Sequence, residues 1–223
     1  MVPIHPSNGA KPYTDDIEYV SDLTAAVKAK AFHLAARIEV VRNAEEKSRG
    51  IGIVRSRREP EEPDVARLAA VDERLWSQTE ARRRASRDAG VVLGLDALCE
   101  KHDLDEVERQ VVILALMPCC GLELFDQLGQ LAAFSFALMS VTPEMIAVFT
   151  DLDLRGRMAL LDQLSPSGRL AQAGIIELEA WGKERVQDSW SSGVFVTDAA
   201  FDRIMGRETA DDAQCPCCGQ TDR

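Results

Sequence analysis

Three cysteines near the end of the sequence have the spacing of a metal-binding turn. The stretch "CPCCG" separates Cys215 from Cys218 by two residues and adds Cys217 between them. In a C-P-x-C-G turn, the proline and glycine shape a tight bend that directs two thiolates toward one tetrahedral zinc ion. A closed structural site needs four ligands, so the remainder would come from another subunit or from further chain. The alternative is a polar tail that carries reactive thiols.

The other residues that could do chemistry do not form a catalytic set. His5, His33 and His102 are scattered singly, and spacing selects no Ser/His/Asp combination. The phosphate-binding pattern G-x-x-x-x-G-K-[ST] is missing, because the Gly182-Lys183 pair is followed by a glutamate. We therefore predict a protein that is not an enzyme and has no cofactor, with zinc at the C-terminal cysteines as the alternative.

Basic side chains in the second half of the chain are the candidates for contacting nucleic acid. They are Arg155, Arg157, Arg169, Lys183 and Arg185. Seven acidic residues share the segment 150–190 with them, and residues 90–210 carry a net charge of −10, against +1 for residues 1–89. Nonspecific affinity for nucleic acid comes from neutralising phosphates. We therefore expect a protein partner rather than DNA.

The elements that hold these residues begin with a long helix over residues 15–47. Two interleaved heptad positions are apolar or small: Ile17, Thr24, Ala31, Ile38 and Val20, Val27, Leu34, Val41. After a Gly- and Pro-containing linker, a second helix is expected over about residues 64–86, with Val65, Leu68, Leu75 and Thr79 facing the first. The two form a predicted helical hairpin, and an intermolecular coiled coil is the alternative. We interpret the basic run "EARRRASRD" as a solvated helix end.

The second region carries clear signals for helix starts. Asp103 and Glu106 have the spacing of a capping box, which predicts a helix from about Leu104 that "MPCCG" interrupts before an apolar helical pattern over residues 122–138. "VTPEM" places Thr142 at an N-cap and proline at the first helical position. Another helix is predicted over residues 154–164, followed by a short one capped by "SP" at 165–166.

The stretch "LSPSGRLAQAGIIEL" turns from a helix to a strand at Gly174, which can end a helix in the left-handed conformation. "VFVTD" supplies a second β-prone segment across a long polar loop in which we expect Gly193 to lie. Two such strands predict a hairpin, or wing. Asp198 is then expected to cap a final helix that Gly206 closes.

The predicted fold is therefore mainly α, a helical hairpin followed by a winged-helix domain with a small two-stranded wing. We expect a leader over residues 1–14, the hairpin over 15–89, the winged helix over 90–208 and a cysteine-containing tail over 209–223.

Four stretches of this sequence resemble a known family: "LDALCEKHDLDEVERQVVILALMPCCGLELFDQLGQL", "VTPEMIAVF", "LSPSGRLAQAGIIEL" and "VFVTDAAFDRIMG". They are similar to the winged-helix region that precedes the catalytic core in a group of bacterial AAA-family ATPases. The resemblance is strongest to ATPases associated with contractile injection systems. It covers residues 91–206, and the ATPase core of those relatives is absent from this sequence.

The resemblance implies a non-catalytic protein-interaction or regulatory module of such an ATPase. Its implied partners are injection-system components or other subunits, with a homo-oligomer among them. The alternative is a winged-helix DNA-binding regulator. No apolar run is long enough to span a membrane, and the N-terminal residues lack the pattern of a secretory signal. We therefore expect a cytoplasmic protein with no membrane contact.

Overall fold

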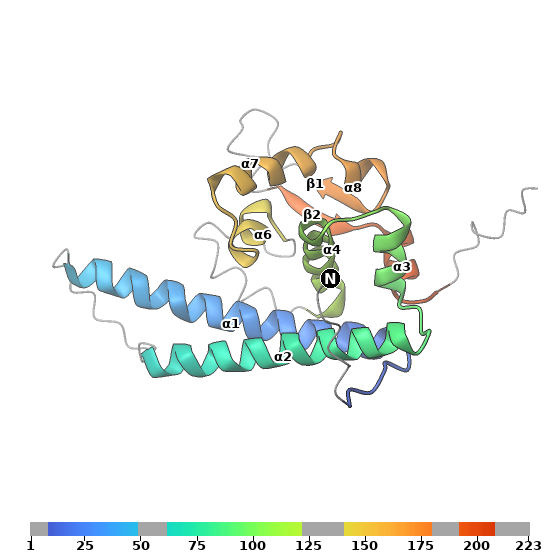
Figure 1. The fold of residues 1–223 in the computed structure, drawn as a ribbon. Coiled ribbons are helices and arrows are strands. Elements are labelled where there is room, and N and C mark those ends of the chain that lie inside the picture. Colours follow the sequence, from blue (N-terminus) through green and yellow to red (C-terminus); the bar gives the residue numbers. More distant parts are fainter. Residues whose placement is uncertain (1–8, 49–61, 122–140, 180–191, 208–223) are drawn as a thin grey trace, which may run out of the picture.

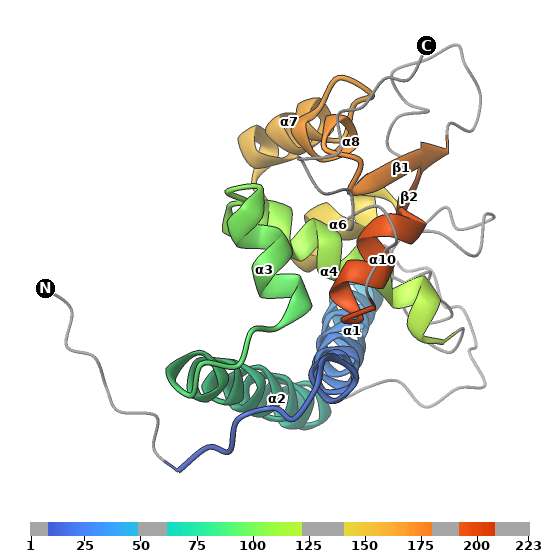
Figure 2. The ribbon, with the colours of Figure 1, turned by 90° about the vertical axis from the view of Figure 1, so that its right-hand side faces the viewer.

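The computed structural model describes residues 9–48, 62–121, 141–179 and 192–207. Two long helices lie side by side, and shorter helices with a two-stranded sheet pack on one side of them (Figure 1). Viewed nearly along the long helices, the smaller elements all lie on the same side of the pair (Figure 2). The architecture is the predicted one, a helical hairpin with a small wing-bearing domain.

The hairpin consists of α1 (Asp16–Ser48) and α2 (Glu62–Asp88), which run antiparallel and contact each other along their lengths (Figure 1). Polar pairs join the two helices: His33 Nδ1 lies 2.9 Å from Asp72 Oδ2, and Arg82 donates to Asp22 at 2.9 Å and also to Glu18. The basic run of α2 is therefore only in part the solvated helix end that we predicted, because Arg84 and Arg87 are exposed but Arg82 is engaged by α1.

The predicted seam of α1 is only partly correct. Val20, Val27 and Ala31 are buried, but Ile17 and Val41 are 64% and 59% exposed. The buried face instead includes Tyr19, Leu23, Ala26, Ala36 and Asn43. The face turns in this way because α1 is covered from two directions, by α2 and by the winged-helix elements, so no single heptad stripe describes it.

Three local features at the start of the second region differ from the prediction. A helix that was not predicted, α3 (Gly94–Lys101), precedes α4 (Glu106–Cys120). The capping box of α4 is formed by Asp105 and Glu108 rather than by the pair two residues earlier. Pro118 does not interrupt α4, because it lies in the last turn, and the helix ends at Gly121 with a φ of 141°. The helical pattern predicted for 122–138 lies outside the described residues.

The next helices follow the sequence signals closely. α6 (Pro143–Phe149) begins as predicted, with Thr142 Oγ1 accepting from the Met145 amide at 3.3 Å. α7 (Leu154–Gln163) has Asp153 as its N-cap. The short α8 (Arg169–Gln172) is capped by the backbone of Gly168 and not by the Ser165-Pro166 pair, because the Ser165 hydroxyl donates to the carbonyl of Asp162 in α7 instead.

The wing has the predicted antiparallel pair, β1 (Ile176–Glu179) and β2 (Gly193–Val196), with Ile176 opposite Val196. Gly174 has a φ of 65°, which confirms the left-handed turn from helix to strand. Val141 makes an isolated bridge to Val194, which places a third extended residue beside β2. Gly193 is the first residue of β2 and not part of the loop that we expected, because it pairs with Glu179.

The last described helix, α10 (Asp198–Ile204), is capped by Thr197 rather than Asp198, since the Thr197 hydroxyl accepts from the Ala200 amide at 3.2 Å. The core centres on α4, whose residues Val111 through Met117 are all almost completely buried. Over the described ranges, every helix is too short or too polar to cross a lipid bilayer.

Candidate interaction site

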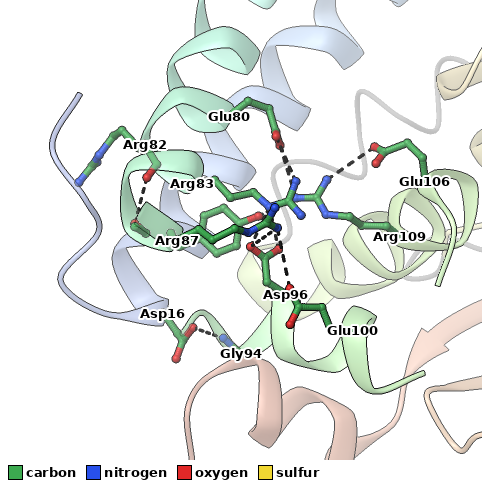
Figure 3. Close-up of polar contacts among 12 residues, drawn as sticks. Asp16, Glu80, Arg82, Arg83, Arg87, Gly94, Asp96, Glu100, Glu106 and Arg109 are labelled. Carbon is green, nitrogen blue, oxygen red and sulfur yellow. Dashed lines mark hydrogen bonds and ion pairs between the residues drawn. The ribbon is translucent and has the colours of Figure 1, made fainter. Parts of the chain in front are cut away.

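The hairpin is fixed to the winged-helix elements by a polar junction of Glu80, Arg83, Asp96 and Arg109 (Figure 3), to which Tyr19 of α1 adds its hydroxyl. Arg83 of α2 donates from Nε to both carboxylate oxygens of Asp96 in α3, at 2.7 and 2.8 Å, and its Nη1 lies 3.1 Å from Glu80. Arg109 of α4 donates to the Tyr19 hydroxyl at 2.6 Å and lies 3.5 Å from Glu80. The junction therefore joins α1 and α2 to both α3 and α4.

The charged side chains of the junction are largely buried, which strengthens the contacts between them. Arg109 is 3% exposed and the Asp96 side chain 11%, so each charge is largely removed from water. Burial alone would lower the pKa of Arg83, but the hydrogen bonds and the charge of Asp96 outweigh it and raise that pKa. Burial likewise raises the pKa of the Tyr19 hydroxyl, which stays neutral and accepts from Arg109. The junction is a structural support and holds no reactive group.

A second contact between the hairpin and the winged-helix elements supplies a hydrogen-bond acceptor for the first backbone amide of α3. Leu93 occupies the N-cap position without a side-chain cap, and Asp16 of α1 accepts from the Gly94 amide at 2.6 Å instead. A Cβ atom at Gly94 would lie 2.3 Å from the carbonyl oxygen of Arg203, so this position admits only glycine. Burial is the largest effect on Asp16, and it raises the pKa of this carboxyl.

The arginine predictions have different outcomes. Arg169 donates to Glu108 Oε1 at 2.9 Å, contacts its other oxygen, and donates to the Asp103 carbonyl at 2.8 Å. The Glu108 side chain is 3% exposed, and although burial opposes ionisation, the bond from Arg169 holds its pKa below the usual value. Arg169 therefore ties α8 to α4.

Two other candidate arginines remain at the surface. Arg155 of α7 is exposed, and it makes no ion pair within the described part of the chain. Arg157 is half-buried and donates from Nε to the Leu152 carbonyl at 3.1 Å. Lys183 and Arg185, and the cysteines Cys215, Cys217 and Cys218, lie outside the described residues.

The part of the chain that the structure describes contains no candidate metal site. No group of three or more His, Cys, Asp or Glu side chains there is arranged to hold an ion. Cys99 is buried, and burial raises the pKa of its thiol to about 11. This thiol is a small core side chain rather than a reactive group.

A groove of about 410 Å³ lies between the C-terminal half of α1 and the elements α6 and α7. Its α1 wall consists of Leu34, Arg37, Ile38, Val41, Arg42 and Glu45, and its other wall of Val148, Asp151 and Arg157. Figure 1 shows α6 between α7 and α1. The ammonium of Lys30 lies 4.5 Å from the centre of the Phe149 ring and joins α1 to α6.

Apolar and basic side chains share this groove. Ile38 and Val41 are 36% and 59% exposed, although aliphatic side chains of this size are usually buried. Within the described ranges, Arg37 and Arg42 form no ion pair, and Arg157 contacts only the backbone. Sequence reasoning missed this site. The signal was available in part, because Leu34, Ile38 and Val41 belong to the predicted seam, but α2 does not cover that section of it.

The order of elements in the described residues is that of a winged helix: α4, the bridge at Val141, α6, α7 with α8, then the two wing strands β1 and β2. The comparison with known families agrees. The model of the family "Winged helix domain, variant" matches residues 2–216, so the chain belongs to this family. Domains of this class are generally not enzymes. No curated protein and no solved structure matches the chain.

Proposed function

We propose that this protein is a non-catalytic interaction module that couples a AAA-family ATPase of a contractile injection system to partner proteins. The class of ATPase comes from the resemblance of the four sequence stretches described above. The observation that carries the interaction role is the groove between α1 and α7, because exposed aliphatic side chains flanked by charged ones are typical of protein-binding surfaces.

The charges support a protein partner in a second way. Residues 90–210 carry a net charge of −10, which opposes long-range attraction of a polyanion. Of the arginines on the helices that precede the wing, Arg169 is engaged by a buried carboxylate of its own chain. The surface that a winged helix would use on DNA is thereby reduced to Arg155 and Arg157 among the described residues.

The proposal is tested by purifying the tagged protein from cells that express it, after nuclease treatment, and identifying the associated proteins by mass spectrometry. We expect subunits of a AAA-family ATPase and injection-system proteins to be enriched over a tag-only control. Enrichment of DNA-bound transcription proteins that disappears with nuclease would contradict the proposal. The purified chain should also fail to bind Mg²⁺-ATP in calorimetry, because it lacks a phosphate-cradling loop.

A DNA-binding regulator remains the second candidate, because Arg155 is exposed on α7, the helix that precedes α8 and the wing. Helices in this position of a winged helix enter the major groove. The discriminating variant is Arg155→Gln with Arg157→Gln, compared with wild type on duplex DNA of random sequence. Tight, salt-sensitive binding that this variant loses would favour the second candidate.

A further inference from the structure

The groove between α1 and α7 is long enough to bind one helix of a partner. Its α1 wall follows the spacing i, i+3, i+4, i+7, i+8 and i+11 from Leu34 to Glu45, which is a single face of the helix. At 1.5 Å per residue this face is about 17 Å long, or about three helical turns. The opposite wall comes from the end of α6 and from α7, so a segment lying along α1 would be held on two sides.

The chemistry of the walls specifies the face of that helix. Leu34, Ile38 and Val41 form an apolar strip with the spacing i, i+4 and i+7, and Val148 adds to it from α6. A partner helix with apolar residues at matching intervals would cover this strip, which is the recognition mode of an amphipathic helix in a groove. Phosphates gain nothing from aliphatic side chains, so the strip does not suit nucleic acid.

The charges specify what must flank the apolar face. Arg37 and Arg42 of α1 and Arg157 of α7 line the groove from both walls, and none of the three has a carboxylate partner within the described ranges. Of the two acids in the described lining, Asp151 lies near enough to the half-buried ammonium of Lys30 to favour its charge, and Glu45 lies at the outer end of the α1 face. The described lining therefore holds three arginines against two acids, in a chain whose net charge is −11.

We propose that the groove binds an amphipathic helix of a partner protein whose apolar face is flanked by Asp and Glu residues. This inference deepens the proposed interaction function and rests on it. Carboxylates on both flanks of such a helix would pair with the arginines of the two walls, so charge complementarity favours acidic over basic partner helices.

The test is a selection from a displayed library of amphipathic peptides about 14 residues long, enough for the three turns of the groove. Apolar residues are fixed at helical spacing, and the flanking positions vary among Asp, Glu, Lys, Arg and Gln. We expect enriched peptides to carry acidic flanks on both sides. Enrichment of basic or uncharged flanks, or no enrichment over the empty matrix, would overturn the proposal.

Variants then locate the binding site by fluorescence polarisation with the best enriched peptide. Arg37→Glu with Arg42→Glu should weaken binding about tenfold, because two attractions become repulsions. The matched control is Arg74→Glu with Arg84→Glu, two exposed α2 arginines outside the groove, which should change affinity less than about twofold. Equal losses of peptide affinity in the two variants, or displacement of the peptide by random duplex DNA, would refute the proposed binding site.

A third variant tests the apolar strip. Val41→Ser should lower the affinity for the peptide. It should not lower the melting temperature of the protein, because Val41 is already 59% exposed. An unchanged affinity would contradict the proposal. The peptide selection uses no ATPase. A failed selection would therefore contradict only the groove proposal, and a failed purification would contradict only the proposed coupling to an ATPase.

Discussion

The ion pair between Arg83 and Asp96 gives the sharpest test of how the hairpin is attached. Asp96→Asn keeps the volume of the side chain but removes the charge that Arg83 contacts at 2.7 and 2.8 Å. The two side chains are 18% and 11% exposed, so little solvent replaces the lost partner. Arg83 keeps one other carboxylate, that of Glu80 at 3.1 Å.

These contacts set the expected magnitude. Breaking a fully buried pair costs about 3–5 kcal/mol, and the remaining Glu80 contact reduces this to about 2 kcal/mol for Asp96→Asn. A double-mutant cycle with Arg83→Gln should give a coupling energy of about 1–2 kcal/mol. The assay is urea unfolding followed by circular dichroism, with the slope of the transition compared among the variants.

The exposed pair of Arg67 and Asp64, 3.9 Å apart on α2, is the matched control. Its cycle should give less than about 0.5 kcal/mol, because solvent screens it. A coupling energy for Arg83 and Asp96 as small as that of the control would refute the reasoning, since the hairpin would then be held to α3 by something other than this junction.

The remaining predictions concern single positions. Gly174→Val should destabilise the fold by about 1–3 kcal/mol because valine resists positive φ, whereas Gly174→Asn should cost much less; equal thermal melts would contradict this. Asp16→Ala should cost about 1 kcal/mol through loss of the cap on α3, with faster amide exchange at Gly94 as the readout. Burial raises the pKa of Asp16, so wild type should gain stability relative to Asp16→Asn as the pH falls from neutral through that raised pKa. Arg169→Gln should lower the melting temperature without changing DNA affinity. Against the effect of burial, this arginine lowers the pKa of Glu108, so the stability difference should shrink as the pH falls through that lowered pKa and Glu108 becomes protonated; a difference independent of pH would count against the pairing.

Elements with strong local chemistry could be predicted from the sequence. Thr142 followed by proline defined the start of α6, and Gly174 defined the change from helix to strand, since each depends on backbone preferences of a few neighbouring residues. The two strands followed from alternation alone. These signals were enough for the winged-helix order, which the family match supports.

Elements that depend on distant residues could not be predicted in this way. The sequence "DLDEVE" contains two overlapping D-x-x-E spacings. The second is selected because Arg169, 61 residues away, holds Glu108. The helix α3 lacks a side-chain cap of its own and borrows Asp16, 78 residues earlier. A reading of local pattern has no access to either contact.

The groove was missed for a similar reason. Arg37 and Arg42 are unremarkable surface residues on α1, and Arg157 was considered only as a DNA contact. They form one site because folding brings α7 next to α1. The zinc prediction at the C-terminal cysteines, the oligomeric state and the identity of the ATPase stay predictions.

Site-specific photo-crosslinking in cells tests the central claim most directly, that this winged helix works through a protein contact at the groove. A photoreactive amino acid replaces Val41, which is 59% exposed in the groove, and Val92, 77% exposed outside it, serves as the control position. We predict a protein adduct at position 41 alone, whose cross-linked peptide is an acidic amphipathic segment of a AAA-family ATPase or an injection-system protein. A DNA adduct, a cross-link within the same chain, or equal adducts at both positions would contradict the account.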